Sequence, residues 1–159
     1  MLSHAATLST MAFAAFTAAT ILPGGSEVVF VSFLATGYEA PLALFVVATV
    51  FNTLGGMTNW WIGTLIAKGA ETEKGHAWLE RFKLPPDMMT RVHDLFERFG
   101  WWALLFSWMP MIGDPITIVA GMARHPPIPT AILTGIGKGL RFAALWAGTA
   151  GVLRYYFPH

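Results

Sequence analysis

The chain has 159 residues, of which 55% are hydrophobic and only 12% are charged, and its net charge is +1. An average soluble domain carries about 25% charged residues, so the composition excludes an ordinary water-exposed surface. The absence of a basic run excludes nucleic acid as a partner. The chain contains no cysteine, which excludes disulfides and a thiolate metal site, and we expect neither a metal nor another cofactor.

Charge is segregated along the chain. Twelve of the 19 charged residues lie between Lys68 and Arg98, so one polar centre separates two long apolar halves. We therefore predict an all-α polytopic membrane protein that forms a single membrane domain over residues 1–159. Its expected parts are a first repeat (5–67), an amphipathic polar linker (68–100) and a second, inverted repeat (101–153).

The first repeat is expected to combine a re-entrant hairpin with a transmembrane helix. Residues 5–22 are uncharged, and residues 28–37 would extend only about 15 Å as a helix, half the thickness of the hydrocarbon core. Residues 42–67 carry no formal charge and can cross the bilayer with some tilt. Two alternatives stay open for residues 5–22: a complete span, or a signal peptide that lacks the usual basic residues before it. The expected turn residues of the hairpin are Pro23, Gly24 and Gly25.

The polar linker is predicted to contain an amphipathic helix. Asp87 follows Pro85-Pro86 and can cap a helix that ends at Gly100. Apolar residues recur on one face of it, which is typical of a helix on a membrane surface or against a bundle. They are Met88, Val92, Leu95, Phe96 and Phe99.

The second repeat follows the same plan as the first. Residues 101–123 are apolar but interrupted, so we expect two short arms of a second re-entrant hairpin, and residues 128–153 form another candidate span. Small residues repeat every fourth position in that span and would let a neighbouring helix approach closely; they are Gly135, Gly139, Ala143, Ala147 and Gly151. The expected turn residues of the second hairpin are Pro110, Gly113 and Pro115.

The spacing Pro23-x-x-x-Glu27 matches Pro110-x-x-x-Asp114. With an odd number of crossings between the two motifs, this match indicates the inverted repeats of secondary transporters. The linker and Arg124 would share one side and hold seven lysines and arginines, which the positive-inside rule places in the cytoplasm.

Four ionisable residues are the first candidates for a substrate- or ion-binding site. Glu27 and Asp114 lie at the predicted hairpin turns, and a charge at membrane depth costs about 2.5 to 3.5 kcal/mol, which usually marks function. Lys138 and Arg141 lie on one face of the last span. The alternatives are that the acids cap helices at the interface and that the bases snorkel to an interface.

Three polar residues complete the candidate binding set: Ser26, Asn52 and Asn59. Hydrogen bonding between helices is the alternative role for the two asparagines. No HExxH, GxSxG or phosphate-loop pattern occurs, so we do not expect an enzyme.

The sequence resembles the DedA family, also called the SNARE-associated or VTT domain superfamily, and within it the small YqaA-like branch. Residues 22–27 (LPGGSE) look like the turn of the family's first re-entrant loop, and residues 107–115 (SWMPMIGDP) with Ala120-Gly121 resemble its second loop. Asn52 to Gly56 with residues 59–63 (NWWIG) resembles a segment of the branch between them. The broader family carries two arginines around the second loop's proline, where this chain has Ser107 and Gly113.

The resemblance implies two inverted re-entrant hairpins in the bacterial inner membrane, and movement of a lipid such as undecaprenyl phosphate or phospholipid, coupled to protons or cations. We therefore expect a multi-pass lipid or lipid-phosphate transporter whose partners are membrane lipids, and a homo-oligomer stays open. The rival functions are a small-cation or proton exchanger and a non-transporting membrane assembly or scaffold protein.

Overall fold

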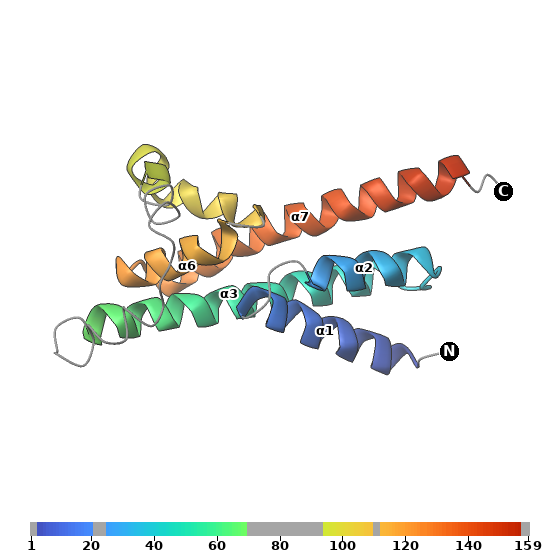
Figure 1. Cartoon of the computed structure of the whole chain (residues 1–159), viewed down its shortest axis with the longest axis horizontal. Coiled ribbons are helices and arrows are strands. Elements are labelled where there is room, and N and C mark those ends of the chain that lie inside the picture. Colours follow the sequence, from blue (N-terminus) through green and yellow to red (C-terminus); the bar gives the residue numbers. More distant parts are fainter. Residues whose placement is uncertain (1–2, 21–24, 70–93, 110–111, 157–159) are drawn as a thin grey trace.

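The computed structural model describes residues 3–20, 25–69, 94–109 and 112–156, and all regular secondary structure in these ranges is helical (Figure 1). The predicted all-α class is therefore confirmed. The elements are α1 (His4–Thr20), α2 (Gly25–Ala35), α3 (Pro41–Gly69), the 3₁₀ helix η1 (Gly100–Trp108), α6 (Gly113–Met122) and α7 (Pro127–Tyr156). Residues 94–99 are also helical, and the rest of the helix predicted from Asp87 lies outside the described residues.

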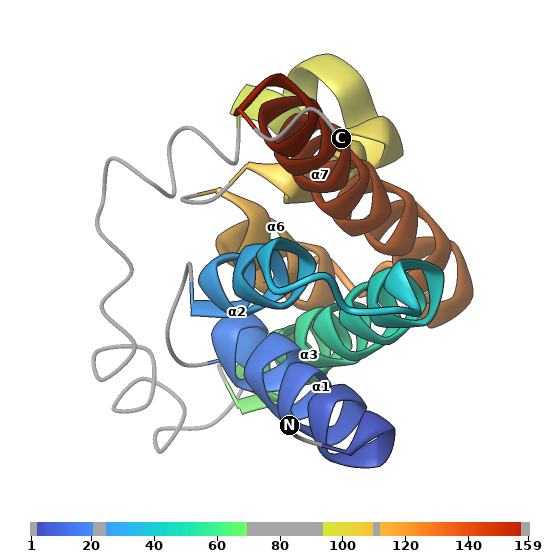
Figure 2. The ribbon, with the colours of Figure 1, turned by 90° about the vertical axis from the view of Figure 1, so that its right-hand side faces the viewer.

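Two long helices, α3 and α7, run antiparallel along the molecule (Figure 1). At one end, α1 and α2 form a hairpin beside them, close to both chain termini. Viewed from this end, α1, α2, α7 and α3 follow one another around a ring (Figure 2). At the other end, η1 packs against α7 and α6 packs against α3.

The first arm of the second hairpin is a 3₁₀ helix, which the apolar pattern of the sequence did not distinguish from an α-helix. In a 3₁₀ helix, side chains three residues apart are aligned. Leu104 and Ser107 accordingly share a buried side of η1.

The second arms of the two hairpins end in the same backbone motif. After α2, the amide of Gly37 donates to the carbonyl of Leu34 (3.1 Å) and the amide of Tyr38 donates to Phe33 (3.3 Å). This is a Schellman motif, in which Gly37 adopts the left-handed φ of 75°.

After α6, the amide of Arg124 donates to Gly121 and that of His125 donates to Ala120, both at 2.9 Å. Arg124 occupies the left-handed position here with φ 56°, although a residue with a Cβ is less favourable there than glycine. The tight turn is therefore kept in both hairpins by different residue types.

The bundle has two buried cores, one beside each hairpin. The first includes Met11, Phe30, Leu44 and Phe142 from α1, α2, α3 and α7. The second is smaller and is formed by η1 and α6 through Ala103, Leu104, Ile116 and Ala120.

Glycines allow α3 to approach α6 until their backbones touch. A Cβ on Gly63 would collide with the carbonyl of Ile118, and a Cβ on Gly121 would collide with the carbonyl of Trp60. Gly55 similarly lies against Ala19 of α1. Small residues on α3 therefore set two of its crossings, as its glycine content indicates.

The small-residue stripe predicted on α7 packs only in its first half. Gly135 and Gly139 lie beside Thr53 and Thr49 of α3, whereas Ala143, Ala147 and Gly151 are exposed. The tightest approach on α7 is instead at Gly137, where a Cβ would collide with Ser107 and the carbonyl of Leu105 in η1.

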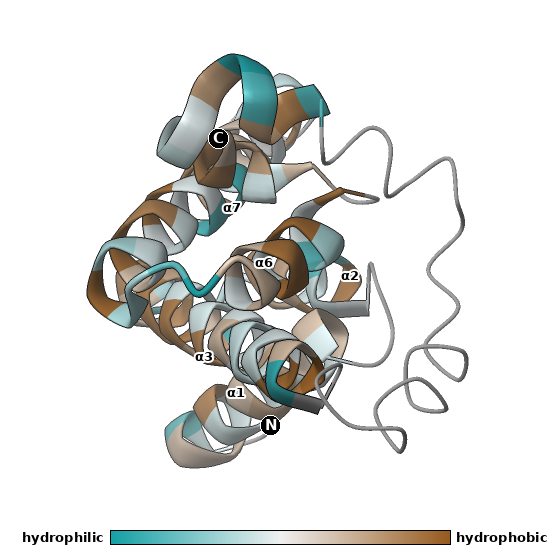
Figure 3. Ribbon diagram, turned by 90° about the vertical axis from the view of Figure 1, so that its left-hand side faces the viewer, coloured by the Kyte–Doolittle hydropathy of each residue, from teal (hydrophilic) through white to brown (hydrophobic). Residues whose placement is uncertain are grey.

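Large apolar side chains face outward at every fourth residue on both long helices. A regular exposed stripe of this kind is unfavourable in water and favourable in lipid. The hydropathy colouring of the ribbon shows hydrophobic residues along both helices (Figure 3). On α3 the stripe includes Val46, Val50 and Leu54, and on α7 it includes Ile128, Ile132, Ile136 and Leu140.

Among the described residues, one helix, Pro41–Lys68, is long and apolar enough to cross a membrane by length and composition. It matches the span predicted for residues 42–67. The span predicted for residues 128–153 forms α7, which has 30 residues. It does not meet the same criterion of length and apolar composition. Lys138, Arg141 and the glycines of α7 lower its mean hydropathy.

Candidate functional site

Glu27 and Asp114 occupy equivalent places in the two hairpins. Each lies in the first turn of a hairpin's second arm, Glu27 in α2 and Asp114 in α6. A carboxylate in this position is stabilised by the helix dipole and by the unpaired amides of the first turn. The two side chains are 27% and 26% exposed, so both carboxylates keep some access to small solutes.

Each acid pairs with one base on α7. The Nζ of Lys138 lies 2.9 Å from Oδ1 of Asp114, and the guanidinium of Arg141 donates to Oε1 of Glu27. The two bases are three residues apart and therefore share a face of α7. The structure thus brings together the four ionisable residues singled out in the sequence, one acid from each hairpin against Lys138 and Arg141 of one helix.

Lys138 is the most deeply placed of the four groups. Its side chain is 2% exposed and packs near Gly56 of α3, Thr117 of α6 and Thr134 of α7. A buried ammonium without a counter-ion would be strongly unfavourable, so the pair with Asp114 offsets the cost of burying Lys138. The side chain points into the bundle rather than toward either end of α7.

Asn52 and Asn59 bind the end of α1 rather than the ion pairs. The Nδ2 of Asn52 donates to the carbonyl of Ala15 (2.9 Å) and lies 3.4 Å from Oγ of Ser26. The Nδ2 of Asn59 donates to the carbonyl of Ala19 at 2.7 Å, one of the last carbonyls of α1, which have no partner within the helix. Both amides therefore make the interhelical hydrogen bonds that were the alternative to a binding role.

Ser26 lies between the amide of Asn52 and the charged groups. It is buried at the start of α2, next to Glu27, and its hydroxyl faces Asn52. Contacts from α1, α2 and α3 therefore fix the first turn of α2, and with it the position of the Glu27 carboxylate.

The predicted turn residues divide into three groups. Pro23, Gly24 and Pro110 lie outside the described residues. Gly25 begins α2 and is exposed, and no described atom outside its own helix turn lies within 4 Å of an added Cβ. Gly113 and Pro115 are buried in the first turn of α6, where proline is tolerated because its missing amide has no helical partner.

The two positions that carry arginine in the broader family have no room for a long side chain. Ser107 is fully buried and its hydroxyl donates to the carbonyl of Thr134 at 3.2 Å. A Cβ on Gly113 would collide with the carbonyl of Ser107, and Gly137 packs against Ser107 from α7. Lys138 directly follows Gly137 in α7.

Sequence reasoning missed an aromatic cluster at the turn between α6 and α7. His125 stacks on Phe96 with ring centroids 5.5 Å apart and meets Trp101 edge-on at 5.1 Å. Its carbonyl accepts a hydrogen bond from Nε1 of Trp60 at 3.0 Å, and burial lowers the pKa of its imidazole. These residues are distant in the sequence, so no local pattern indicates the cluster.

In the described part of the chain, no three histidine, aspartate or glutamate side chains gather where they could hold a metal ion. The site consists instead of two acids and two bases whose formal charges balance. In such a site, the bases can leave the acids to bind an anionic ligand, and the acids can bind protons in place of the bases.

Comparison with known proteins gives the family. The VTT domain family matches residues 22–150. Inner membrane protein YqaA of Escherichia coli strain K12 is 34% identical over 148 residues, which cover 93% of this chain and 94% of that protein. The protein of the same name from Shigella flexneri has the same identity and coverage.

An uncharacterized protein of Haemophilus influenzae is 32% identical over 149 residues, with 89% and 87% of the two chains covered. No solved structure matches the chain. The chain belongs to the VTT domain (DedA) family of helical membrane proteins, as its resemblance to the family predicted. The names of the two relatives support a location in the bacterial inner membrane.

Proposed function

We propose that the protein is a multi-pass transporter of the bacterial inner membrane that translocates a lipid or lipid phosphate, such as undecaprenyl phosphate or a phospholipid, with coupling to protons. The observation that carries the proposal is the pairing of one acid from each hairpin with Lys138 and Arg141 of α7. Charged groups in a membrane bundle are costly and usually mark a transport path.

The lengths of α2 and α6 support two re-entrant hairpins. These helices have 11 and 10 residues, or about 15 to 17 Å, which is roughly half the hydrocarbon thickness. The N-terminus of each arm would then lie near the middle of the membrane. Half-helix N-termini at that depth bind anionic groups of substrates in secondary transporters.

Repeated local structure supports an inverted repeat. Tyr38 and His125 each follow the hairpin acid by eleven residues, and each closes a Schellman motif. Each also meets a ring from the first arm edge-on: Tyr38 contacts His4 at 5.0 Å, and His125 contacts Trp101 at 5.1 Å. Two similar hairpins rocking about α3 and α7 would open the charged site alternately to the two sides.

The ion pairs suggest how an anion and a proton would be coupled. A phosphate entering the site would take Arg141 and Lys138 from Glu27 and Asp114, because arginine and lysine both bind phosphate oxygens strongly. A carboxylate that loses its base at membrane depth becomes easier to protonate. Uptake of one phosphate charge together with a proton keeps the net charge of the site unchanged.

Lys138 takes the place of the family arginines in this proposal. Ser107 and Gly113 are closed by packing, and Lys138 reaches into the bundle from the neighbouring turn of α7. Lysine presents a single charged group rather than the fork of arginine, so substrate selection would differ from that of relatives with both arginines.

Transport by the purified protein in vesicles with a headgroup-labelled lipid tests the proposal. Glu27→Gln and Asp114→Asn should each slow translocation about tenfold or more, because a charge-assisted hydrogen bond contributes about 1.5 to 3 kcal/mol. Asp94→Asn removes a carboxylate from an exposed position in the polar linker and should leave the rate unchanged.

Wild-type rates in both hairpin variants would show that these acids do not have the assigned roles. Cation flux reported by a dye, without lipid movement, would favour the exchanger. Recovery of a stoichiometric cross-linked partner, with no flux of any solute, would favour the scaffold.

A further inference from the structure

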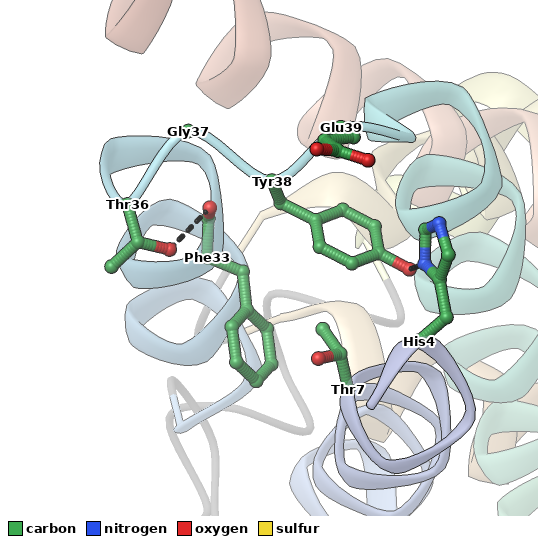
Figure 4. A pocket seen from close by; sticks show the side chains of 7 residues that line it. All are labelled: His4, Thr7, Phe33, Thr36, Gly37, Tyr38 and Glu39. Atoms are coloured by element: carbon green, nitrogen blue, oxygen red, sulfur yellow. Dashed lines mark hydrogen bonds between the residues drawn. The ribbon is translucent and has the colours of Figure 1, made fainter. Parts of the chain in front are cut away.

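A cavity of about 490 Å³ lies at the base of the first hairpin, away from the ion pairs. It is open on one side and is bordered by the first turn of α1, the end of α2 and the turn that leads to α3 (Figure 4). Cavities that bind small molecules typically measure about 300 to 1,000 Å³. The volume is therefore sufficient for a small organic ligand or a lipid headgroup.

Three rings line this cavity and are held in fixed positions. The Nδ1 of His4 and the hydroxyl of Tyr38 are 2.5 Å apart, and their rings meet edge-on. The ring of Phe33 lies 6.5 Å from that of Tyr38, and Figure 4 shows both rings on the α2 side with Thr7 facing them from α1. Because the hydrogen bond orients Tyr38, its ring is a preorganised wall.

The charge around the cavity favours a cation. Among the described lining residues, Glu39 is the only acidic side chain and there is no lysine or arginine. The carbonyl end of α2 reaches the cavity at Thr36 and Gly37, and the C-terminal end of a helix carries a partial negative charge. Of the opposing amides at the start of α1, those of Ala6 and Thr7 are paired with Ser3.

We propose that this cavity binds an organic ammonium group, primary or quaternary, between the rings of Phe33 and Tyr38 and the carboxylate of Glu39. Aromatic rings attract ammonium ions through their electron-rich faces, and aromatic lining with a nearby carboxylate is suited to choline-like and ethanolamine-like groups. An anion without an ammonium group, such as inorganic phosphate, would be repelled by Glu39. This second site goes beyond the proposed transport of lipid and does not depend on it.

Binding of choline to the full chain, purified in a maltoside detergent, tests the site. Equilibrium dialysis with labelled choline should show saturable binding. The uncharged isostere 3,3-dimethylbutan-1-ol should compete about tenfold less well, because it lacks the charge that the rings and Glu39 attract. Equal competition by the isostere, or no saturable binding, would overturn the proposal.

Substitutions of the lining residues test whether choline binds in this cavity. Tyr38→Leu should weaken choline binding about tenfold and Glu39→Gln about fivefold, whereas Tyr38→Phe keeps the ring and should stay within about threefold of wild type. Asp94→Asn is the matched loss of a carboxylate elsewhere and should bind normally. If Tyr38→Leu does not fold, the contrast between Glu39→Gln and Asp94→Asn decides, and equal binding by these two variants would contradict the site.

A short-chain phosphatidylcholine identifies the source of the ammonium. If the site takes a lipid headgroup, this lipid should displace labelled choline more effectively than free choline does, and if it takes a soluble amine the order should be reversed. Glu27→Gln should retain choline binding. Loss of transport and loss of this site can therefore be told apart.

Discussion

Lys138 shows how strongly one residue depends on its partner. Its ammonium is buried among residues of α3, α6 and α7, and in the described part of the chain Asp114 is the carboxylate paired with it. Removing one member of a buried ion pair leaves an uncompensated charge, whereas replacing both members by neutral groups costs much less. The stability of the bundle should therefore respond differently to the single and the double substitution.

Asp114→Asn is expected to destabilise the protein by about 3 kcal/mol, because the buried Lys138 loses its counter-ion. Lys138→Met added to this variant should recover most of the loss. Thermal unfolding in detergent micelles, followed by circular dichroism, measures both changes. A double variant that is no more stable than Asp114→Asn would show that the pair does not set the stability of this region.

Burial distinguishes Lys138 from Arg141. Arg141 is 14% exposed and pairs with Glu27, so the pair lies nearer the surface than Lys138 and Asp114. Exposed ion pairs contribute little to stability. The Glu27 pair is therefore the one that a ligand could open at lower cost.

The contact between α3 and α6 is set by glycine at two positions. Gly63 and Gly121 each lie against a carbonyl of the opposite helix, so the backbones touch without intervening side chains. This contact holds the second hairpin on α3 and thereby fixes Asp114 opposite Lys138.

Gly121→Ala is expected to destabilise the protein by about 2 kcal/mol, because the new methyl group would collide with the backbone of α3 rather than with a movable side chain. Gly148→Ala is the control, since Gly148 lies in α7 with nothing within 4 Å of an added Cβ. It should be neutral or slightly stabilising, because alanine favours helix over glycine. Equal thermal unfolding midpoints for Gly121→Ala and Gly148→Ala in the same micelles would contradict the close contact between α3 and α6.

At the scale of the whole molecule, the outward apolar stripes of α3 and α7 and the charged interior give the arrangement expected of a bundle in lipid. Ser3 and Thr36 lie near the end that carries both termini, and Lys68 lies at the opposite end of α3. The proposed topology therefore places Ser3 and Thr36 on the side of the inner membrane away from the cytoplasm, and Lys68 in the cytoplasm.

The chain has no cysteine, so single cysteines can report this topology directly. A membrane-impermeant maleimide added to spheroplasts should label Ser3→Cys and Thr36→Cys, and should label Lys68→Cys only after permeabilisation. The reverse pattern would contradict the cytoplasmic assignment. Labelling of Thr36→Cys and Lys68→Cys from one side would contradict a membrane span in α3.

The sequence alone determined the features that depend on local composition. The span predicted for residues 42–67 is observed as Pro41–Gly69, because an uncharged apolar run of this length can satisfy its backbone only as a helix in lipid. The two short second arms, α2 and α6, and the family were also readable, because motifs of proline, glycine and acidic residues mark them.

Only the tertiary structure decided which groups meet. The pairing of Asp114 with Lys138 and of Glu27 with Arg141, the binding of Asn52 and Asn59 to α1, and the tight packing of Gly137 on η1 depend on where helices cross. The cavity between His4 and Tyr38 joins residues 34 positions apart. Hydrophobic length and turn chemistry act locally along a chain, whereas these contacts depend on the angles and registers at which separate helices pack, which no single segment specifies.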